Sequence, residues 1–82
     1  MTKEQALKII EKEQLKHYNA DEGRHHKENE VGICREKGGW KVYVTDERAS
    51  IITGSESVFE NENAAWENFV KRLRADKMLR EL

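Results

Sequence analysis

Few residues in this chain have the type and spacing that metal binding requires. His25 and His26 are adjacent, so their side chains point in divergent directions along the chain. Together with His17 and Cys34 they show none of the CxxC, HxxxH or HExxH spacings typical of metal sites. We therefore predict that the histidines are solvated side chains and that the chain holds no metal.

Nucleophilic catalysis also lacks a motif. Cys34 has no histidine in a sequence context that would place a base beside it. Ser55 and Ser57 lack the strand–turn–helix elbow that exposes a catalytic serine. Gly38-Gly39 joins two β-rich segments, so it indicates a hairpin turn rather than a phosphate-binding loop. We predict that the protein is not an enzyme and uses no cofactor.

The composition describes one small, highly charged domain, residues 1–82. Charged residues make up 38% of the 82 residues, against about 25% in an average globular protein. No apolar run approaches the roughly 20 residues that span a bilayer, and the first residues do not form a secretion segment. A single cysteine favours a reducing compartment. We expect a cytoplasmic protein without membrane contact.

The N-terminal segment predicts an amphipathic helix over residues 2–18. Thr2 and Gln5 have the spacing of a capping box. Spacings of three and four place one set of residues on a common face: Leu7, Ile10, Gln14 and Tyr18. Residues 19–29 show no periodicity and form either a mobile connection or a functional loop.

Residues 31–59 predict three antiparallel strands. Two of them, 31–35 and 40–45, are joined by Gly38-Gly39, which would place Ile33 opposite Val44. The predicted core face carries Val31, Ile33, Trp40, Val42 and Val44, with Arg35 as a misfit. Tyr43 falls on the opposite, open face with Cys34 and Lys41. A third strand at 51–53 is expected to continue loosely towards Phe59.

The last helix is predicted from Glu62 to Arg80, with Asn61 as its cap. Its apolar stripe consists of Ala65, Trp66, Phe69, Val70 and Leu73. A second stripe, about 170° around the helix, consists of Ala75, Met78, Leu79 and Leu82. It forms either a dimer contact or an end that packs back on the loop. The expected fold is an α+β two-layer sandwich, helix–three-stranded antiparallel meander–helix, with both helices on one sheet face.

Charge is unevenly distributed along the chain. Between residues 46 and 67 there are six carboxylates and one arginine, whereas residues 68–82 hold five basic and two acidic residues. The helix dipole accounts for part of this distribution, because acids suit the start of a helix and bases its end. It does not account for the acids that precede the helix. These predict an acidic rim, built from the 46–49 turn and the 56–62 segment, that attracts a basic partner.

The expected element order is also that of a double-stranded-RNA-binding domain. Such domains contact phosphates through lysines at the start of their last helix. Here that start carries Glu60 and Glu62, whose charge is wrong for a phosphate. We therefore predict that the chain does not bind nucleic acid.

Residues 31–73 contain a Trp-x-Val-Tyr strand at 40–43, an Asp-Glu-Arg turn at 46–48, and Phe59 before a helix with Trp66 and Phe69. This pattern resembles a family of small bacterial immunity proteins from polymorphic toxin systems. The resemblance implies a stoichiometric inhibitor that occludes a toxin made by the same cell, and it implies no catalytic site.

We therefore expect a protein-binding module, an immunity-like inhibitor that binds a cognate toxin through an acidic turn and the open sheet face. The resemblance supplies Tyr43, Asp46, Glu47 and Arg48 as partner-binding residues, and the charge layout adds Glu56, Glu60 and Glu62. The alternative is a structural or regulatory domain that self-associates through its C-terminal helix. Met78, Leu79 and Leu82 would form that contact, in a monomer or weak homodimer.

Overall fold

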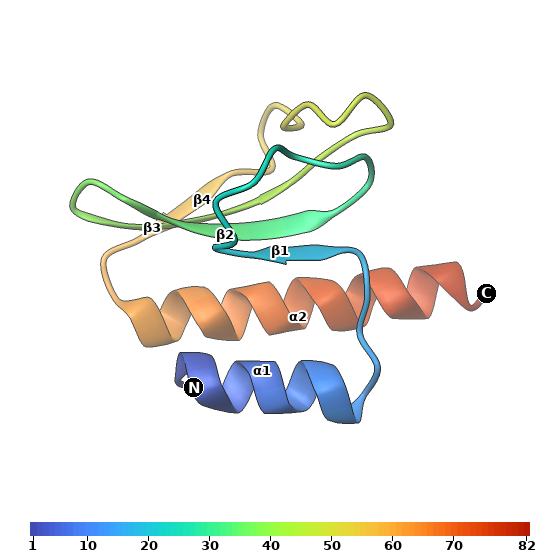
Figure 1. Ribbon diagram of the computed structural model, residues 1–82, viewed down its shortest axis with the longest axis horizontal. Coiled ribbons are helices and arrows are strands. Elements are labelled where there is room, and N and C mark those ends of the chain that lie inside the picture. Colours follow the sequence, from blue (N-terminus) through green and yellow to red (C-terminus); the bar gives the residue numbers. More distant parts are fainter.

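The computed structural model describes residues 1–82 as two helices and a four-stranded sheet (Figure 1). In chain order the elements are α1 (Lys3–Lys12), β1 (Tyr18–Ala20), β2 (Val31–Glu36), β3 (Gly39–Val44), β4 (Ser57–Phe59) and α2 (Glu62–Arg80). The strands lie side by side in the same order; β1 runs parallel to β2, and the other pairs are antiparallel. The α+β class is confirmed. The three-stranded antiparallel meander is wrong, because a short parallel strand precedes it.

Helix α1 begins where the capping box predicts. The Gln5 N–H donates to Thr2 Oγ1 at 3.2 Å, and the Thr2 N–H donates to Gln5 Oε1 at 2.8 Å. These two bonds satisfy backbone donors that the first turn of a helix leaves free.

The same helix ends at Lys12, well before the predicted residue 18. Gln14 adopts a left-handed conformation with φ 54°, and the Leu15 N–H donates to the Ile10 carbonyl at 2.9 Å. This is a Schellman helix end, which glycine usually marks and which here uses glutamine. The chain then turns away, so Tyr18 opens β1 instead of extending the helix.

The β2–β3 hairpin turns one residue earlier than the glycine pair predicts. Glu36 lies opposite Gly39, so the turn consists of Lys37 and Gly38, the latter at φ 84°. Gly39 instead opens β3, where a Cβ atom would collide with the carbonyl oxygen of Phe59. Gly38 is therefore favoured by its positive φ, and Gly39 by the lack of room for a Cβ atom.

The change of register does not alter which side chains lie on which face of the sheet. Ile33 lies opposite Val42 and not Val44, and a shift of two residues leaves every side chain on its predicted face. The core face carries buried Val31, Ile33, Trp40 and Val42, with Val44 partly buried beside them. The misfit Arg35 lies with its guanidinium carbon 5.0 Å from the centroid of the Trp40 ring.

The third predicted strand is displaced along the chain. Ile51 makes only an isolated bridge to Thr45. The paired strand is β4, in which Val58 lies opposite Lys41 and Phe59 opposite Trp40. β4 therefore forms one edge of the sheet.

Helix α2 has the predicted boundaries. Asn61 caps it by accepting a hydrogen bond from the Ala64 N–H at 3.2 Å. Its first stripe, Ala65, Trp66, Phe69, Val70 and Leu73, is fully buried. Neither α1 nor α2 is long and apolar enough to cross a membrane.

Both helices lie on the same side of the sheet, but they do not share one layer on it as the predicted two-layer sandwich requires (Figure 1). Helix α2 packs against β2, β3 and β4, whereas α1 packs mainly against α2 and lies farther from the strands. The Trp66 ring is 6.0 Å from the Trp40 ring and 5.5 Å from the Phe69 ring, centroid to centroid. This aromatic cluster joins α2 to the sheet and leaves the other sheet face without a helical layer.

Candidate functional site

The sheet face away from the helices carries the residues that the sequence singled out for binding. Two rows of paired residues cross it: Asn19, Gly32 and Tyr43, then Cys34, Lys41 and Val58. Residues 21–30 connect the parallel strands β1 and β2, and because the helices occupy the other side, this connection crosses the outer face (Figure 1). We call the first row the covered half and the second row the open half.

Tyr43 belongs to the covered half and is only 2% exposed. Its ring lies across Gly32, where any Cβ atom would overlap the ring, and the His26 ring lies above it at 5.0 Å between centroids. Burial raises the pKa of the Tyr43 hydroxyl to about 12. The prediction that Tyr43 is an exposed interface anchor is therefore wrong, although the residue does lie on the predicted face.

The 21–30 connection is held down by a buried ion pair that sequence reasoning missed. Glu30 is 3% exposed, and both of its carboxylate oxygens accept bonds from Arg24, at 3.2 and 2.9 Å. The Lys27 N–H donates to the same carboxylate at 3.0 Å. Burial raises the pKa of Glu30, but the hydrogen bonds from Arg24 and Lys27 outweigh it and hold this pKa below its usual value of 4.5.

Thr45 ties the same connection to β3. Its hydroxyl accepts from the Glu30 N–H at 2.9 Å and donates to the Lys27 carbonyl at 2.7 Å. Arg24 adds a bond to the Tyr18 carbonyl at 2.9 Å. An arginine and a glutamate in a polar stretch are typical of a solvated loop, so the sequence carried no signal for this network.

The histidines and Cys34 are not gathered into one site. His25 and His26 lie in the connection, and no group of three or more His, Cys, Asp or Glu side chains lies together in a metal-binding arrangement. Burial raises the pKa of the Cys34 thiol and outweighs the opposing effect of Lys41. The thiol is therefore protonated at neutral pH, which makes it a poor nucleophile.

The open half displays an ion pair and an apolar side chain. Lys41 Nζ lies 2.9 Å from Glu36 Oε1, and this hydrogen bond raises the pKa of Lys41. Val58, its neighbour on β4, is 69% exposed. The segment before Val58 is fixed by Arg72, which donates to the Ser55 carbonyl at 2.7 Å and to the Ser57 hydroxyl at 2.9 Å. Both serines thus have structural contacts.

The 46–49 turn uses one of its predicted binding groups internally. Asp46 Oδ1 accepts from the Arg48 N–H at 2.8 Å and from the Ser50 N–H at 3.1 Å. These backbone hydrogen bonds, that from Ser50 first, lower the pKa of Asp46. The side chains of Glu47 and Arg48 are exposed, so they remain available to a partner.

The carboxylates of the predicted acidic rim lie at different positions along the sheet. Glu60 follows Phe59, which lies opposite Trp40, whereas Asp46 lies six residues beyond Trp40 along the chain. At about 3.3 Å per residue, the two carboxylates are roughly 20 Å apart along the strand direction. Glu62, next to Glu60, accepts from the Trp66 indole N–H at 3.1 Å. Glu56, which precedes Ser57 opposite Val42, lies between Asp46 and Glu60, so the carboxylates of the predicted rim are spread along the sheet rather than clustered.

The second stripe of α2 remains uncovered. Met78 and Leu79 are each 69% exposed, and Leu82 is 96% exposed. Helix α2 is one continuous element from Glu62 to Arg80. The apolar stripe therefore does not pack on the loop, although the same end of α2 contacts the 21–30 connection through Arg80 Nη2, which donates to the Asn29 carbonyl at 3.0 Å.

Comparisons with known proteins identify no relative of this chain. Neither a protein-family model, nor a curated protein, nor a solved structure matches it. The resemblance of residues 31–73 to immunity proteins therefore stays a prediction, and the functional argument rests on the surfaces described above.

Proposed function

We propose that this chain is a bacterial protein-binding module that acts in the cytoplasm as an immunity-like stoichiometric inhibitor. Its binding surface is the open half of the outer sheet face together with the edge strand β4. The observation that carries this proposal is an unpaired strand edge beside an exposed apolar side chain, since β4 pairs only with β3 and Val58 is 69% exposed. A second chain can cover such an edge by adding backbone hydrogen bonds and burying the valine.

The charges around Val58 define the kind of partner. Glu56 and Glu60 precede and follow β4 and are exposed, and the only nearby cation on the open half, Lys41, is already paired with Glu36. A surface with excess negative charge around an apolar centre suits a basic partner. Glu47 and Arg48 form a separate, peripheral contact at the far end of the sheet.

Three residues of the predicted binding set are buried or form hydrogen bonds within the protein instead. Tyr43 is buried, Asp46 closes its own turn and Glu62 accepts from Trp66. We therefore assign the contact with the partner to Glu56, Val58 and Glu60. In this proposal the chain inhibits the partner by covering its surface and not by a chemical reaction.

The test begins with the genes that flank this one. An exported protein with a toxic C-terminal domain encoded beside it supplies the partner, and co-expression with this chain should restore growth. Reversing both charges, Glu56→Lys with Glu60→Lys, should weaken binding at least about tenfold and abolish rescue. The matched control is Glu11→Lys with Glu28→Lys, two exposed carboxylates on α1 and the 21–30 connection.

Two results would overturn the proposal. Full rescue by the Glu56→Lys, Glu60→Lys variant would show that the partner does not bind at the assigned surface. Toxicity that persists with the wild-type chain would show that the chain is not an inhibitor of this toxin. Circular dichroism of each variant shows that the fold is retained.

A second function, self-association through α2, is favoured by the exposure of Met78, Leu79 and Leu82. It predicts a dimer that forms as the protein concentration rises. Sedimentation of the wild-type chain beside a Met78→Ser, Leu79→Ser variant measures it. A wild-type chain that remains at 9.6 kDa at high concentration contradicts this function.

A further inference from the structure

The two edges of the sheet differ in how their backbone groups are satisfied. Strand β1 forms one edge, and its bonds to β2 leave the Tyr18 carbonyl and the Ala20 N–H pointing outward. Arg24 Nη2 donates to this carbonyl at 2.9 Å, and the outward N–H donates to Glu22 Oε2 at 3.0 Å. These two side chains of the 21–30 connection therefore close the β1 edge to a further strand.

The backbone groups of Val58, on the opposite edge, have no such cover. The N–H of Val44 on β3 donates to Ser55 Oγ at 3.2 Å, and its carbonyl accepts from the Ile52 N–H at 2.9 Å. Because this direction recurs at every second residue of a strand, β3 bonds to β4 through the two residues that flank Val58. Val58 itself points its N–H and carbonyl away from the sheet, and none of the turn and loop hydrogen bonds reaches them.

The side chains along this edge alternate between the two faces of the sheet. Val58 lies on the outer face, and alternation places Glu56 and Glu60 on the same face. Ser57, between two of them, points to the helical side, where its hydroxyl accepts from Arg72 of α2 at 2.9 Å. The edge therefore presents an acid–apolar–acid pattern on a segment that α2 already holds in place.

The two carboxylates that flank Val58 have no cationic partner within the chain. Neither Glu56 nor Glu60 forms an ion pair. Lys41 lies opposite Val58 but is bonded to Glu36 at 2.9 Å. Its pKa is raised first by this hydrogen bond and also by the charge of Glu56, which agrees with a position of Glu56 on the outer face.

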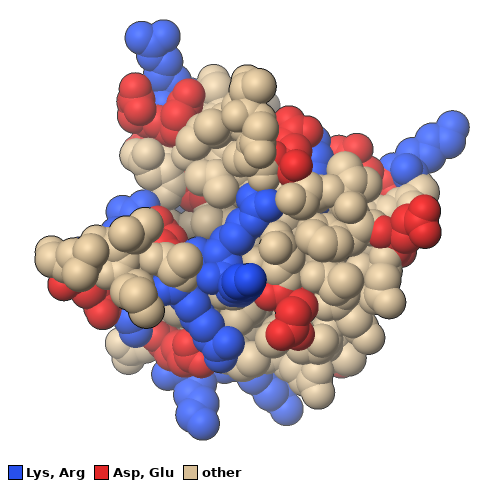
Figure 2. All heavy atoms as spheres, turned by 180° about the vertical axis from the view of Figure 1, so that it is seen from behind, with Lys and Arg blue, Asp and Glu red and all other residues tan.

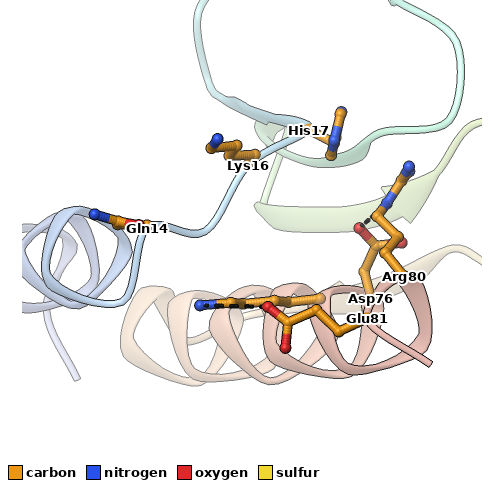
Figure 3. Close-up of a pocket in the computed structure, with 7 residues that line it drawn as sticks. Gln14, Lys16, His17, Asp76, Arg80 and Glu81 are labelled. Atoms are coloured by element: carbon orange, nitrogen blue, oxygen red, sulfur yellow. Dashed lines mark hydrogen bonds and ion pairs between the residues drawn. The ribbon is translucent and has the colours of Figure 1, made fainter.

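Other parts of the surface neutralise their charges within the chain. A cavity of about 220 Å³ lies between the α1–β1 segment and the end of α2 (Figure 3). There Asp76 pairs with Arg80 at 2.8 Å, and Glu81 lies 3.9 Å from a lysine one turn earlier, Lys77. Viewed from behind, the Lys and Arg side chains across the middle of the molecule have Asp and Glu side chains beside them (Figure 2). The β4 edge differs, because its cations must come from a second chain.

We propose that β4 binds an extended segment of its partner, added as an antiparallel strand with an apolar residue opposite Val58 and a lysine or arginine two residues away on each side. In this register the apolar residue exchanges two backbone hydrogen bonds with Val58, and the two cations lie opposite Glu56 and Glu60. The inference rests on the proposed function for the position of the contact, and it adds the shape and sequence of the partner.

A second copy of this chain fits the same edge poorly. Antiparallel pairing of β4 with itself about Val58 would set Glu56 opposite Glu60 of the second copy. Like charges directly opposite each other destabilise a sheet. The two acids therefore favour a different chain that carries cations, and they oppose self-pairing through β4.

The test uses synthetic heptapeptides and the backbone amide NMR shifts of the full chain. The basic probe is acetyl-Thr-Lys-Thr-Val-Thr-Lys-Thr-amide, and an acidic control replaces both lysines by glutamate. A third peptide has N-methylvaline at its centre, which removes the N–H that would bond to the Val58 carbonyl. We expect the basic probe to give saturable shifts in residues 56–60, with a dissociation constant on the order of 1 mM. Each control peptide should bind at least about tenfold more weakly.

Exchanging the charges of the edge tests the recognition pattern. Glu56→Lys with Glu60→Lys should reverse the preference, so that the acidic peptide binds more tightly than the basic one. The matched control, Glu11→Lys with Glu28→Lys, changes the net charge equally and should keep the wild-type preference. Equal binding of the N-methylvaline peptide, or a preference that the control variant also reverses, would overturn the strand pairing.

Co-expression with the toxic domain separates this inference from the proposed function. If growth is rescued but the basic peptide does not bind, the strand pairing is wrong and the inhibitor function stands. If the peptide binds as expected but the wild-type chain does not rescue growth, the inhibitor function is wrong and the strand-binding edge stands.

Discussion

At the residue scale, Glu30 is the group that most clearly couples a single side chain to the shape of the outer sheet face. It is buried and joins Arg24, the Lys27 backbone and Thr45. Replacing Glu30 by Gln leaves Arg24 with only one carboxylate, that of Glu22 at the longer distance of 3.3 Å, so we expect a loss of about 2–3 kcal/mol in the free energy of unfolding. Urea denaturation measures it, with the exposed Glu28→Gln as control. A loss no larger than that of the control would contradict a stabilising role for the pair.

The same carboxylate makes stability depend on pH. The pKa of Glu30 is lower in the folded chain than its usual value of 4.5, so its ionised form stabilises the fold above that pH. This stabilisation is lost as the pH falls through the folded pKa, because the unfolded chain then binds more protons. The free energy of unfolding should therefore decrease below pH 4.5, and the decrease should be smaller in Glu30→Gln. Equal pH dependence in both chains would assign the effect to other carboxyl groups.

Gln14 offers the opposite kind of change, a stabilising one. Its φ of 54° closes helix α1 in a conformation that glycine adopts without steric cost. We expect Gln14→Gly to raise the free energy of unfolding by about 1 kcal/mol. Gln14→Ala is the control at the same position, because alanine removes the side chain without relieving the backbone. An equal gain in both variants would mean that the side chain, not the backbone, is the source.

At the element scale, strand β2 accommodates Tyr43 of β3 only because residue 32 has no side chain. A Cβ atom at Gly32 would overlap the Tyr43 ring, and both residues are buried. We expect Gly32→Ala to cost about 3 kcal/mol, at the upper end for overpacked sites. In a Tyr43→Leu background the same substitution should cost much less, and a double-mutant cycle of unfolding free energies measures the difference. Strictly additive costs would show that the contact between the two residues is not the cause.

The elements also show what can be predicted from sequence. Helix α2 is local in origin: Asn61 caps it and one stripe buries it, so its limits were predicted correctly. The end of α1 was missed because glutamine closes it where glycine would have been the signal. Strand β1 was missed because the three residues Tyr18–Ala20 carry no alternating pattern and depend on pairing with β2.

The error at Tyr43 follows from the missed strand. Alternation along β3 correctly put this side chain on the outer face. Its burial comes from the 21–30 connection, which crosses that face only because β1 is parallel to β2. A parallel pairing is a long-range property, so the hydrophobic pattern of β3 alone predicts which face a residue occupies but not whether that face is covered.

At the scale of the whole molecule, a net charge of −1 conceals a division into acidic and basic surfaces. The exposed carboxylates Glu56 and Glu60 lie beside the edge strand, whereas the basic residues of α2 lie towards its C-terminal end. Exposed charges are screened over about 8 Å at physiological ionic strength and about 3 Å at 1 M salt. Added salt should therefore weaken the binding of a basic partner to the β4 surface. The effect should lie mainly in the association rate, since steering precedes contact.

We expect the association rate with the proposed partner to fall steeply as salt rises, while the dissociation rate changes little. Glu56→Lys should lower the rate at low salt and flatten its salt dependence, whereas Val58→Ser should raise the dissociation rate and leave the salt dependence intact. Stopped-flow kinetics on these two variants separates two effects. The carboxylates should change the association rate, and the apolar side chain of Val58 should change the dissociation rate. If both substitutions change only the dissociation rate, steering by the acidic end of the sheet plays no part in binding.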